Sequence, residues 1–177
     1  NMKISTQKQT EEYIKIVKND GLKLATISQL NQTNEICKAA VSQNGMALRH
    51  VALQFMTHEI CAIAVKQCGY ALRYSPIKTY DICFLAVTQY SLALEFVNDQ
   101  TPEIVIAAVE KHGMALKFAK EKSYDACVIA IKQNPNSIQF VPNQTEELIN
   151  LAISINPAVI RHIHKPTTDM CIYCVEY

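Results

Sequence analysis

The strongest candidate for chemistry near the end of the chain is a Cys-x-x-Cys pair, Cys171 and Cys174, with His162 and His164 a short distance upstream. Two thiolates and two imidazoles are a ligand set that zinc accepts in a tetrahedral site. Cys171, Cys174 and His162 also fall on positions of a repeat, described below, that favour packing over metal binding. The sequence therefore predicts no metal and no cofactor, with these four residues as the candidates if a metal is bound.

A second set of candidate residues is a series of polar side chains that recur near the ends of short apolar segments. The series consists of Arg49, Arg73, Glu95, Lys117, Gln139 and Arg161. Stacked repeats can read single-stranded RNA one base per repeat when such side chains lie beside aromatic ones. Glu95 and Gln139 interrupt the series, and the net charge of +1 supplies no long-range attraction for nucleic acid. The basic residues Arg49, Arg73, Lys117 and Arg161 are thus a candidate binding surface.

The sequence offers little for catalysis. It contains no Gly-x-Ser-x-Gly, no His-Glu-x-x-His and no phosphate-binding glycine loop. All four glycines fall where helices are predicted to end, and one acid per repeat falls where a helix is predicted to begin. These residues already have structural roles, so we predict that the protein is not an enzyme.

The acids belong to a pattern of Ser or Thr, any residue, an acid and then apolar residues. It recurs mostly every 22 residues, which indicates a repeat array. The repeats begin near Thr10, Thr33, Thr57, Thr79, Thr101, Ser123, Thr145 and Thr167.

The repeat beginning at Thr101 shows why each repeat is predicted to form two helices. Thr101 can cap a helix, Pro102 suits its first position, and Glu103 opposes the positive helix end. Apolar residues then recur with helical spacing, with an alanine seven residues after the cap in six repeats. In four repeats, a glycine in the left-handed conformation is expected to end this first helix. These glycines are Gly21, Gly45, Gly69 and Gly113. A shorter helix of about two turns follows.

These features predict an all-α fold, an α-solenoid of tandem 22-residue helix-turn-helix repeats in a single domain over residues 1–177. The first and last repeats are expected to act as caps with water-tolerant outer faces. The connector 52–56 is longer than the others and carries Phe55, which either covers the core or offers a docking position. Covering is the favoured interpretation.

Composition restricts the environment. Five of the seven cysteines lie four residues after the Ser or Thr of their repeat, which indicates buried packing positions in a reducing compartment, not a disulfide framework. No apolar run is long enough to span a membrane, and the first 20 residues do not resemble a signal peptide.

The segment 40–48, Ala-Val-Ser-Gln-Asn-Gly-Met-Ala-Leu, and its near copy at 64–72 resemble a short helical repeat of unknown function that is abundant in proteins of giant amoeba-infecting, mimivirus-like viruses. The acid-apolar helix starts, such as Asp81-Ile82, share this resemblance, which extends over about residues 33–163. It implies a viral protein in the cytoplasm of an infected host. It carries no catalytic residues.

Together, the repeats and this resemblance predict a non-catalytic scaffold or adaptor that binds a viral or host protein, with no membrane contact. Residues that vary between repeats are the natural contact set. Binding of single-stranded RNA along the basic series is the alternative, and a third possibility is that the chain is one region of a larger viral protein.

Overall fold

The computed structural model describes the backbone of residues 2–176, and within that range it contains α-helices and 3-10 helices but no strand. The predicted all-α class and its helical repeats are confirmed. The α-helices are α1 (Met2–Asn19), α2 (Asn34–Gln43), α3 (His58–Gln67), α4 (Tyr80–Gln89), α5 (Pro102–Lys111), α6 (Tyr124–Gln133), α7 (Glu146–Ile155) and α8 (Thr168–Glu176). The 3-10 helices are η1 (Gly21–Thr26), η2 (Gln29–Asn31), η3 (Gly45–His50), η4 (Leu53–Phe55), η5 (Gly69–Tyr74), η6 (Ser91–Phe96), η7 (Gly113–Phe118), η8 (Pro135–Phe140) and η9 (Pro157–His162).

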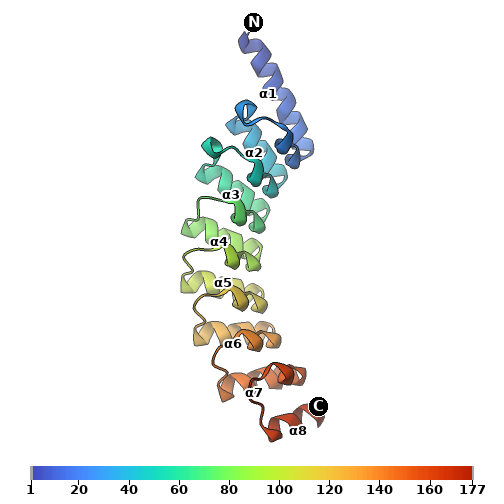
Figure 1. The fold of residues 1–177 in the computed structure, drawn as a ribbon, viewed down its shortest axis with the longest axis vertical. Helices are drawn as coiled ribbons and strands as arrows, with labels where there is room; N and C mark the ends of the chain where they lie inside the picture. Colours follow the sequence, from blue (N-terminus) through green and yellow to red (C-terminus); the bar gives the residue numbers. More distant parts are fainter. Residues whose placement is uncertain (1, 177) are drawn as a thin grey trace. The chain divides into compact units, whose positions relative to one another are not determined.

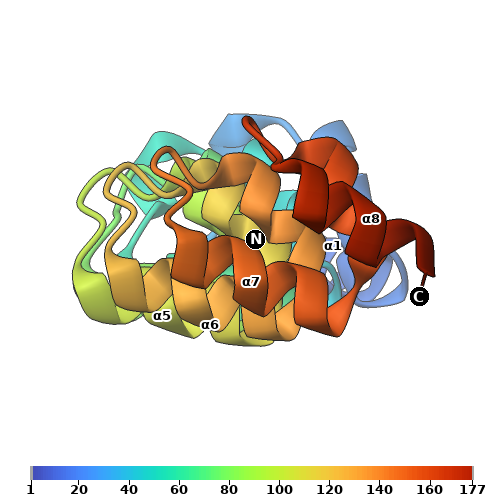
Figure 2. The same ribbon diagram turned by 90° about the horizontal axis from the view of Figure 1, so that it is seen from below.

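The contacts divide the chain into two compact parts, which we call the N-terminal part (Asn1–Asn98) and the C-terminal part (Asp99–Tyr177). In the N-terminal part, α1 to α4 follow one another, and each contacts the next (Figure 1). In the C-terminal part, α5, α6 and α7 likewise lie side by side in one layer (Figures 1 and 2). The 3-10 helices pack against these α-helices and against one another within each part.

From α2 onward, the helix starts are those that the sequence predicts. The side chains of Thr33, Thr57, Ser123 and Thr145 each accept a hydrogen bond from the amide of the residue three positions later. Such caps satisfy an amide that the first helical turn leaves without a partner. Thr79 and Thr101 occupy the same position in extended backbone, and Pro102 is the first residue of α5.

The expected helix start at Thr10 is wrong, because Thr10 lies inside α1. The segment before it, residues 2–9, contains no glycine or proline and consists largely of residues that a helix accepts. A Thr-x-acid sequence caps a helix only where the preceding chain is extended. Here the helix continues through it.

The second helix of each repeat is a six-residue 3-10 helix, close to the predicted two turns. In the repeat from Thr33, α2 ends at Gln43, and Asn44 separates it from η3. The side chain of Asn44 accepts a hydrogen bond from the Met46 amide at 3.0 Å and so caps η3. Asn134 and Asn156 cap η8 and η9 in the same way.

The core lies between the α-helices and the 3-10 helices. Each of the four repeats that begin at Thr33, Thr57, Thr79 and Thr101 contributes two apolar pairs from its α-helix and an apolar pair from its 3-10 helix. In the repeat from Thr57 these are Ile60, Cys61, Ala64, Val65, Ala71 and Leu72, all 0 % exposed. The repeated alanine and cysteine positions are therefore packing positions, as predicted, at Cys37, Cys61, Cys83 and Cys127.

The prediction that the glycines adopt the left-handed conformation is wrong, since no described glycine has a positive φ. The glycines are instead required by close approach between repeats. A Cβ atom on Gly45 would overlap the carbonyl oxygen of Ala64, and one on Gly113 would overlap that of Ala130. The Gly45 amide also donates to Oε1 of Gln67 at 2.6 Å. A side chain at this junction would separate the two repeats.

A buried glutamine ties one connector to the next. Gln32 is 4 % exposed, donates from Nε2 to the His50 carbonyl at 2.9 Å and accepts from the Ala52 amide at 2.8 Å. Gln100 and Gln144 make the same pair of bonds to residues 18 and 20 positions later. The connectors thus satisfy their buried backbone groups through a side chain of the preceding repeat.

The α8 helix does not present the polar outer face expected of a terminal cap. Val175 is 87 % and Ile172 53 % exposed, and Cys171 is exposed although the corresponding cysteines of earlier repeats are buried.

Candidate interaction surface

The structure does not assemble the candidate zinc ligands. Among the described residues, no three His, Cys, Asp or Glu side chains lie close enough together to hold a metal ion. Cys171 and Cys174 lie on α8, whereas His162 ends η9 and His164 is in the connector. Of the four predicted zinc ligands, only the two cysteines lie on the same helix.

Burial separates the cysteines into reactive and unreactive groups. Burial raises the pKa of Cys37 to about 11, whereas Cys171 is exposed. Because the thiolate is the nucleophile, Cys37 is almost entirely in its unreactive thiol form at pH 8. We expect a disulfide reagent to modify Cys171 first in the folded protein and Cys37 only after unfolding in urea. Mass spectrometry of the labelled peptides measures this order. Labelling of Cys37 as fast as Cys171 in the folded state would contradict the described packing.

The basic residues of the predicted series are exposed, as an interaction surface requires. Arg49 and Arg73 lie on the adjacent helices η3 and η5 of the N-terminal part, where Glu95 on η6 follows them. Lys117 and Arg161 lie on η7 and η9 of the C-terminal part, with Gln139 on η8 between them. Within the N-terminal part the series ends in the acidic Glu95, and within the C-terminal part the neutral Gln139 interrupts it.

The arginines of this series are bound to their own neighbours. Nε of Arg49 donates to Nε2 of His50 at 2.8 Å, and Arg161 makes the same bond to His162 at 3.2 Å. Burial, together with the charge of Arg49, lowers the pKa of His50, which favours the neutral ring that accepts this bond. Nε2 of each histidine is thus already used as an acceptor.

The aromatic rings beside the series are similarly occupied. The Arg73 guanidinium lies 5.8 Å from the centre of the Phe96 ring and donates to the Tyr70 hydroxyl at 2.9 Å. The Tyr70 ring meets that of Phe96 edge to face at 5.3 Å. The Lys117 ammonium lies 5.4 Å from the Phe118 ring centre. Cations of the protein itself therefore cover ring faces on which RNA bases would have to stack.

Phe55 on η4 is half-buried, whereas its neighbour Leu53 is 82 % exposed. The favoured interpretation of the long connector, that its apolar residues cover the core, therefore fails for Leu53. Leu30 on η2, in the preceding connector, is 93 % exposed. The extra residues of these connectors form short 3-10 helices that project one leucine each.

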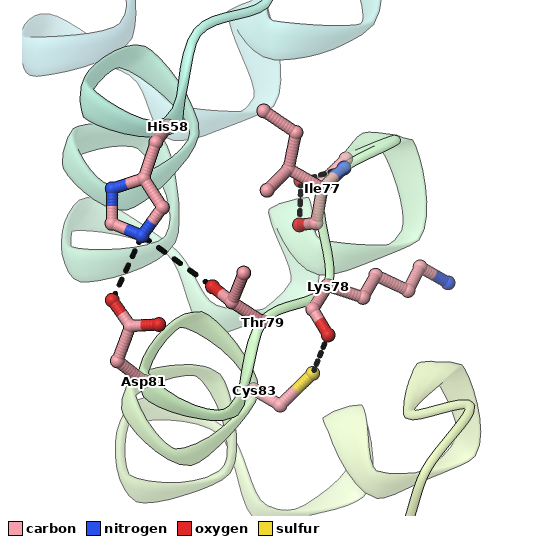
Figure 3. A network of polar contacts seen from close by, with 7 residues as sticks. His58, Ile77, Lys78, Thr79, Asp81 and Cys83 are labelled. Carbon is pink, nitrogen blue, oxygen red and sulfur yellow. Dashed lines mark hydrogen bonds and ion pairs between the residues drawn. The ribbon is translucent and has the colours of Figure 1, made fainter.

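A polar network joins α3 to the start of α4 (Figure 3). Nε2 of His58 lies 2.9 Å from Oδ2 of Asp81 and 3.4 Å from Oγ1 of Thr79. A catalytic triad uses both ring nitrogens, one for the carboxylate and one for the nucleophile. Here both oxygens meet the same nitrogen, so the ring cannot relay a proton between them. The Thr79 hydroxyl and the His58 charge lower the pKa of Asp81, which fits an ion pair between repeats.

The sequence reasoning missed a band of apolar residues on the solvent side of the α-helices. These residues are the fifth and sixth after the caps of α3 to α6 and the sixth after the cap of α7, and their side is opposite the buried positions of the helix. We call the band the α-face; it comprises Ala62, Ile63, Phe84 and Leu85 in the N-terminal part and Ile106, Ala107, Val128, Ile129 and Leu151 in the C-terminal part. All are half-buried except Phe84, which is 37 % exposed.

Two exposed aromatic side chains at the α-face form a stacked pair. The rings of Tyr80 and Phe84 are stacked, with centres 5.8 Å apart and planes 19° apart. Tyr80 is 53 % exposed. The signal in the sequence was an apolar pair at positions where an amphipathic helix ordinarily carries polar residues.

Comparison with known proteins gives a limited match. Residues 101–145 match the model of a family described as a domain of unknown function, DUF4116. The match runs from the cap of α5 to the cap of α7 and so covers two consecutive repeats. Neither the curated proteins nor the solved structures contain a significant match to the chain. None of the described helices combines the length and apolar character needed to cross a membrane. The comparisons thus relate these two repeats to a family with no known activity.

Proposed function

We propose that this protein is a non-catalytic scaffold that binds another protein through the α-face. The observation that carries the proposal is the apolar pair at the fifth and sixth positions, which recurs on α3 and α4 and again on α5 and α6. The fully buried core positions lie on the opposite side of each helix. A band of this kind on the solvent side therefore serves contact with something outside the chain.

The aromatic pair Tyr80 and Phe84 is the natural anchor of this surface. Rigid aromatic side chains contribute a large contact area for little lost conformational entropy, and they are enriched among the residues that dominate binding energy. Their mutual stacking holds both rings in place before a partner arrives. Preorganisation of this kind reduces the entropic cost of association.

Binding of single-stranded RNA along Arg49, Arg73, Lys117 and Arg161 is less well supported. Their side chains are exposed, but Arg49 and Arg161 bond to neighbouring histidines and Arg73 to a neighbouring tyrosine. The resemblance to the giant-virus repeat suggests a viral or host partner in the cytoplasm of the infected cell. This origin and location are part of the proposal.

Affinity capture from infected or host cells, with nuclease treatment, tests the proposal. We expect to capture a protein whose recovery survives nuclease treatment and which binds again when purified. The Phe84→Ser variant should fail to capture it. Truncating an aromatic anchor costs about 2 kcal/mol, or roughly a 30-fold weaker Kd by titration calorimetry.

Leu53→Ser is the matched control, because it removes an exposed apolar side chain outside the α-face. It should leave the affinity unchanged, and circular dichroism should show both variants folded. A purified partner that binds Phe84→Ser as tightly as the original protein would exclude the α-face of the N-terminal part. A partner lost on nuclease treatment would favour the nucleic-acid alternative.

A further inference from the structure

The two parts of the chain differ in the charge that borders the α-face. In the N-terminal part, side chains of the preceding repeat pair with the acids at the helix starts of α3 and α4. Nζ of Lys38 lies 2.6 Å from Oε1 of Glu59, and Nε2 of His58 lies 2.9 Å from Oδ2 of Asp81. Lys38 is the fifth residue after its cap, and His58 is the first.

The C-terminal part has no cation at the equivalent positions. The fifth residues after the caps of α5 and α6 are Ile106 and Val128, and the first residues are Pro102 and Tyr124. The repeats before Asp125 and Glu147 therefore carry apolar or aromatic residues at the positions from which Lys38 reaches Glu59 and His58 reaches Asp81. Within its own repeat, Glu147 accepts a hydrogen bond from the Thr145 hydroxyl at 3.4 Å. Within the described residues, both salt bridges belong to the N-terminal part.

Asp125 and Glu147 border the α-face directly. The second, fifth and sixth residues after a cap point to the same side of an α-helix. Asp125 thus shares a side of α6 with Val128 and Ile129, and Glu147 shares a side of α7 with Leu151. Both carboxylates are exposed. This surface combines an apolar band with a row of negative charge along its edge at the helix starts.

We propose that the α-face of the C-terminal part binds an amphipathic protein segment that has apolar residues on one side and Lys or Arg along one edge. The inference rests on the proposed protein-binding function and adds the chemistry of the partner. Burial of the apolar band supplies the driving force, and the cations supply selectivity by pairing with Asp125 and Glu147.

The spacing of the surface constrains this segment. Packed helices lie about 8–10 Å apart, which sets the separation of Asp125 and Glu147 on adjacent helices. Residues seven apart in an α-helix are separated by about 10.5 Å, so a helix lying across α6 and α7 can place one cation at each carboxylate.

The remaining charges of this face fix the orientation of the segment. Glu110 and Lys132 are the ninth residues after the caps of α5 and α6 and lie toward the helix ends. Glu110 on α5 would attract a cation at that end, but Lys132 on α6 would repel one, so a segment across α6 and α7 places its basic edge over the helix starts.

The test uses a fluorescein-labelled peptide of about 18 residues, or five helical turns, with leucines on one side and lysines along one edge. Its matched control carries glutamate in place of each lysine. By fluorescence anisotropy on the full chain, we expect the lysine peptide to bind and the glutamate peptide not to bind. Binding should weaken as salt increases, because exposed charge pairs are screened.

Two double variants separate this site from its counterpart in the N-terminal part. Asp125→Asn with Glu147→Gln should weaken the lysine peptide about tenfold, or about threefold for each exposed pair. Asp81→Asn with Glu59→Gln removes acids that already have partners and should leave the affinity unchanged. Ile129→Ser tests the apolar band and should also weaken binding.

Three results would overturn the inference: no binding of the lysine peptide, equal binding of the glutamate peptide, or unchanged affinity in the Asp125 and Glu147 double variant. The same double variant applied to a captured protein separates the two proposals. A partner that depends on Ile129 but is indifferent to the two acids sustains the scaffold function and contradicts the basic segment. Binding of the lysine peptide at the two acids, with no protein captured, supports the site chemistry and contradicts the scaffold function.

Discussion

Replacement of Gly45 by alanine is expected to lower the free energy of unfolding by about 2–3 kcal/mol, in the upper range for an added methyl group in a tightly packed site. The new Cβ atom would overlap the carbonyl oxygen of Ala64 in the next repeat. That carbonyl belongs to α3 and accepts the Cys68 amide at 2.9 Å, so it cannot turn aside without breaking a helix-ending bond. The two repeats would have to move apart.

This result has the opposite sign to the usual effect of such a substitution. Where the backbone has a negative φ, glycine to alanine normally stabilises by about 0.4–1 kcal/mol because it restricts the unfolded chain. Gly45 has no positive φ, so alanine meets no conformational penalty there. The expected loss is therefore entirely steric.

Urea unfolding followed by circular dichroism measures the change, provided that the m-value stays constant. Gly113→Ala should lower the free energy of unfolding in the same way, since its Cβ would overlap the Ala130 carbonyl. Ser91→Ala is the control, because the equivalent position of η6 already carries a Cβ atom. A stabilised Gly45→Ala protein would show that the junction relaxes at no cost.

Substitution of Gln32 by leucine is expected to cost about 2–4 kcal/mol of stability. The Gln32 side chain satisfies the His50 carbonyl and the Ala52 amide at once, and both bonds lie in a largely buried connector. Leucine has a similar size but can neither donate nor accept. Each buried backbone group left without a partner costs about 1–3 kcal/mol, and the apolar gain of leucine offsets only part of this.

Gln54→Leu is the matched control, because it makes the same chemical change at an exposed residue of η4. It should change the unfolding free energy by less than about 0.5 kcal/mol. Hydrogen exchange adds a local measurement: the Ala52 amide should lose protection in Gln32→Leu but keep it in the control. Protection of Ala52 in both proteins would show that water or another group replaces the glutamine.

The periodic pattern was sufficient to predict each α-helix from α2 to α7, because helix starts depend on neighbouring residues. The Thr57 hydroxyl reaches an amide three residues away, so the signal for α3 is contained in a few positions. The Thr10 prediction failed for a related reason. Whether a capping sequence acts depends on the conformation of the chain before it, and residues 2–9 continue as helix.

The role of the glycines could not be predicted from local rules. A glycine after a helix suggests a left-handed turn, and Gly45 fits that pattern in sequence. Its actual requirement is set by Ala64, almost 20 residues away, whose carbonyl occupies the space of a side chain. Similarly, nothing local to Gln32 shows that its partners are at His50 and Ala52.

The sequence by itself determined the repeat length, the all-α class, the helix starts from α2 onward and the buried positions of the helices, because each follows from short-range hydrogen bonding or helical periodicity. Only the tertiary structure decided which surface residues are available to a partner. Stacking of repeats places Lys38 against Glu59 and His58 against Asp81, but an apolar or aromatic residue at the equivalent positions before Asp125 and Glu147. It also places the Arg73 guanidinium over the Phe96 ring of the next repeat. These differences arise between residues about 20 positions apart, which only the packing of one repeat on the next brings together.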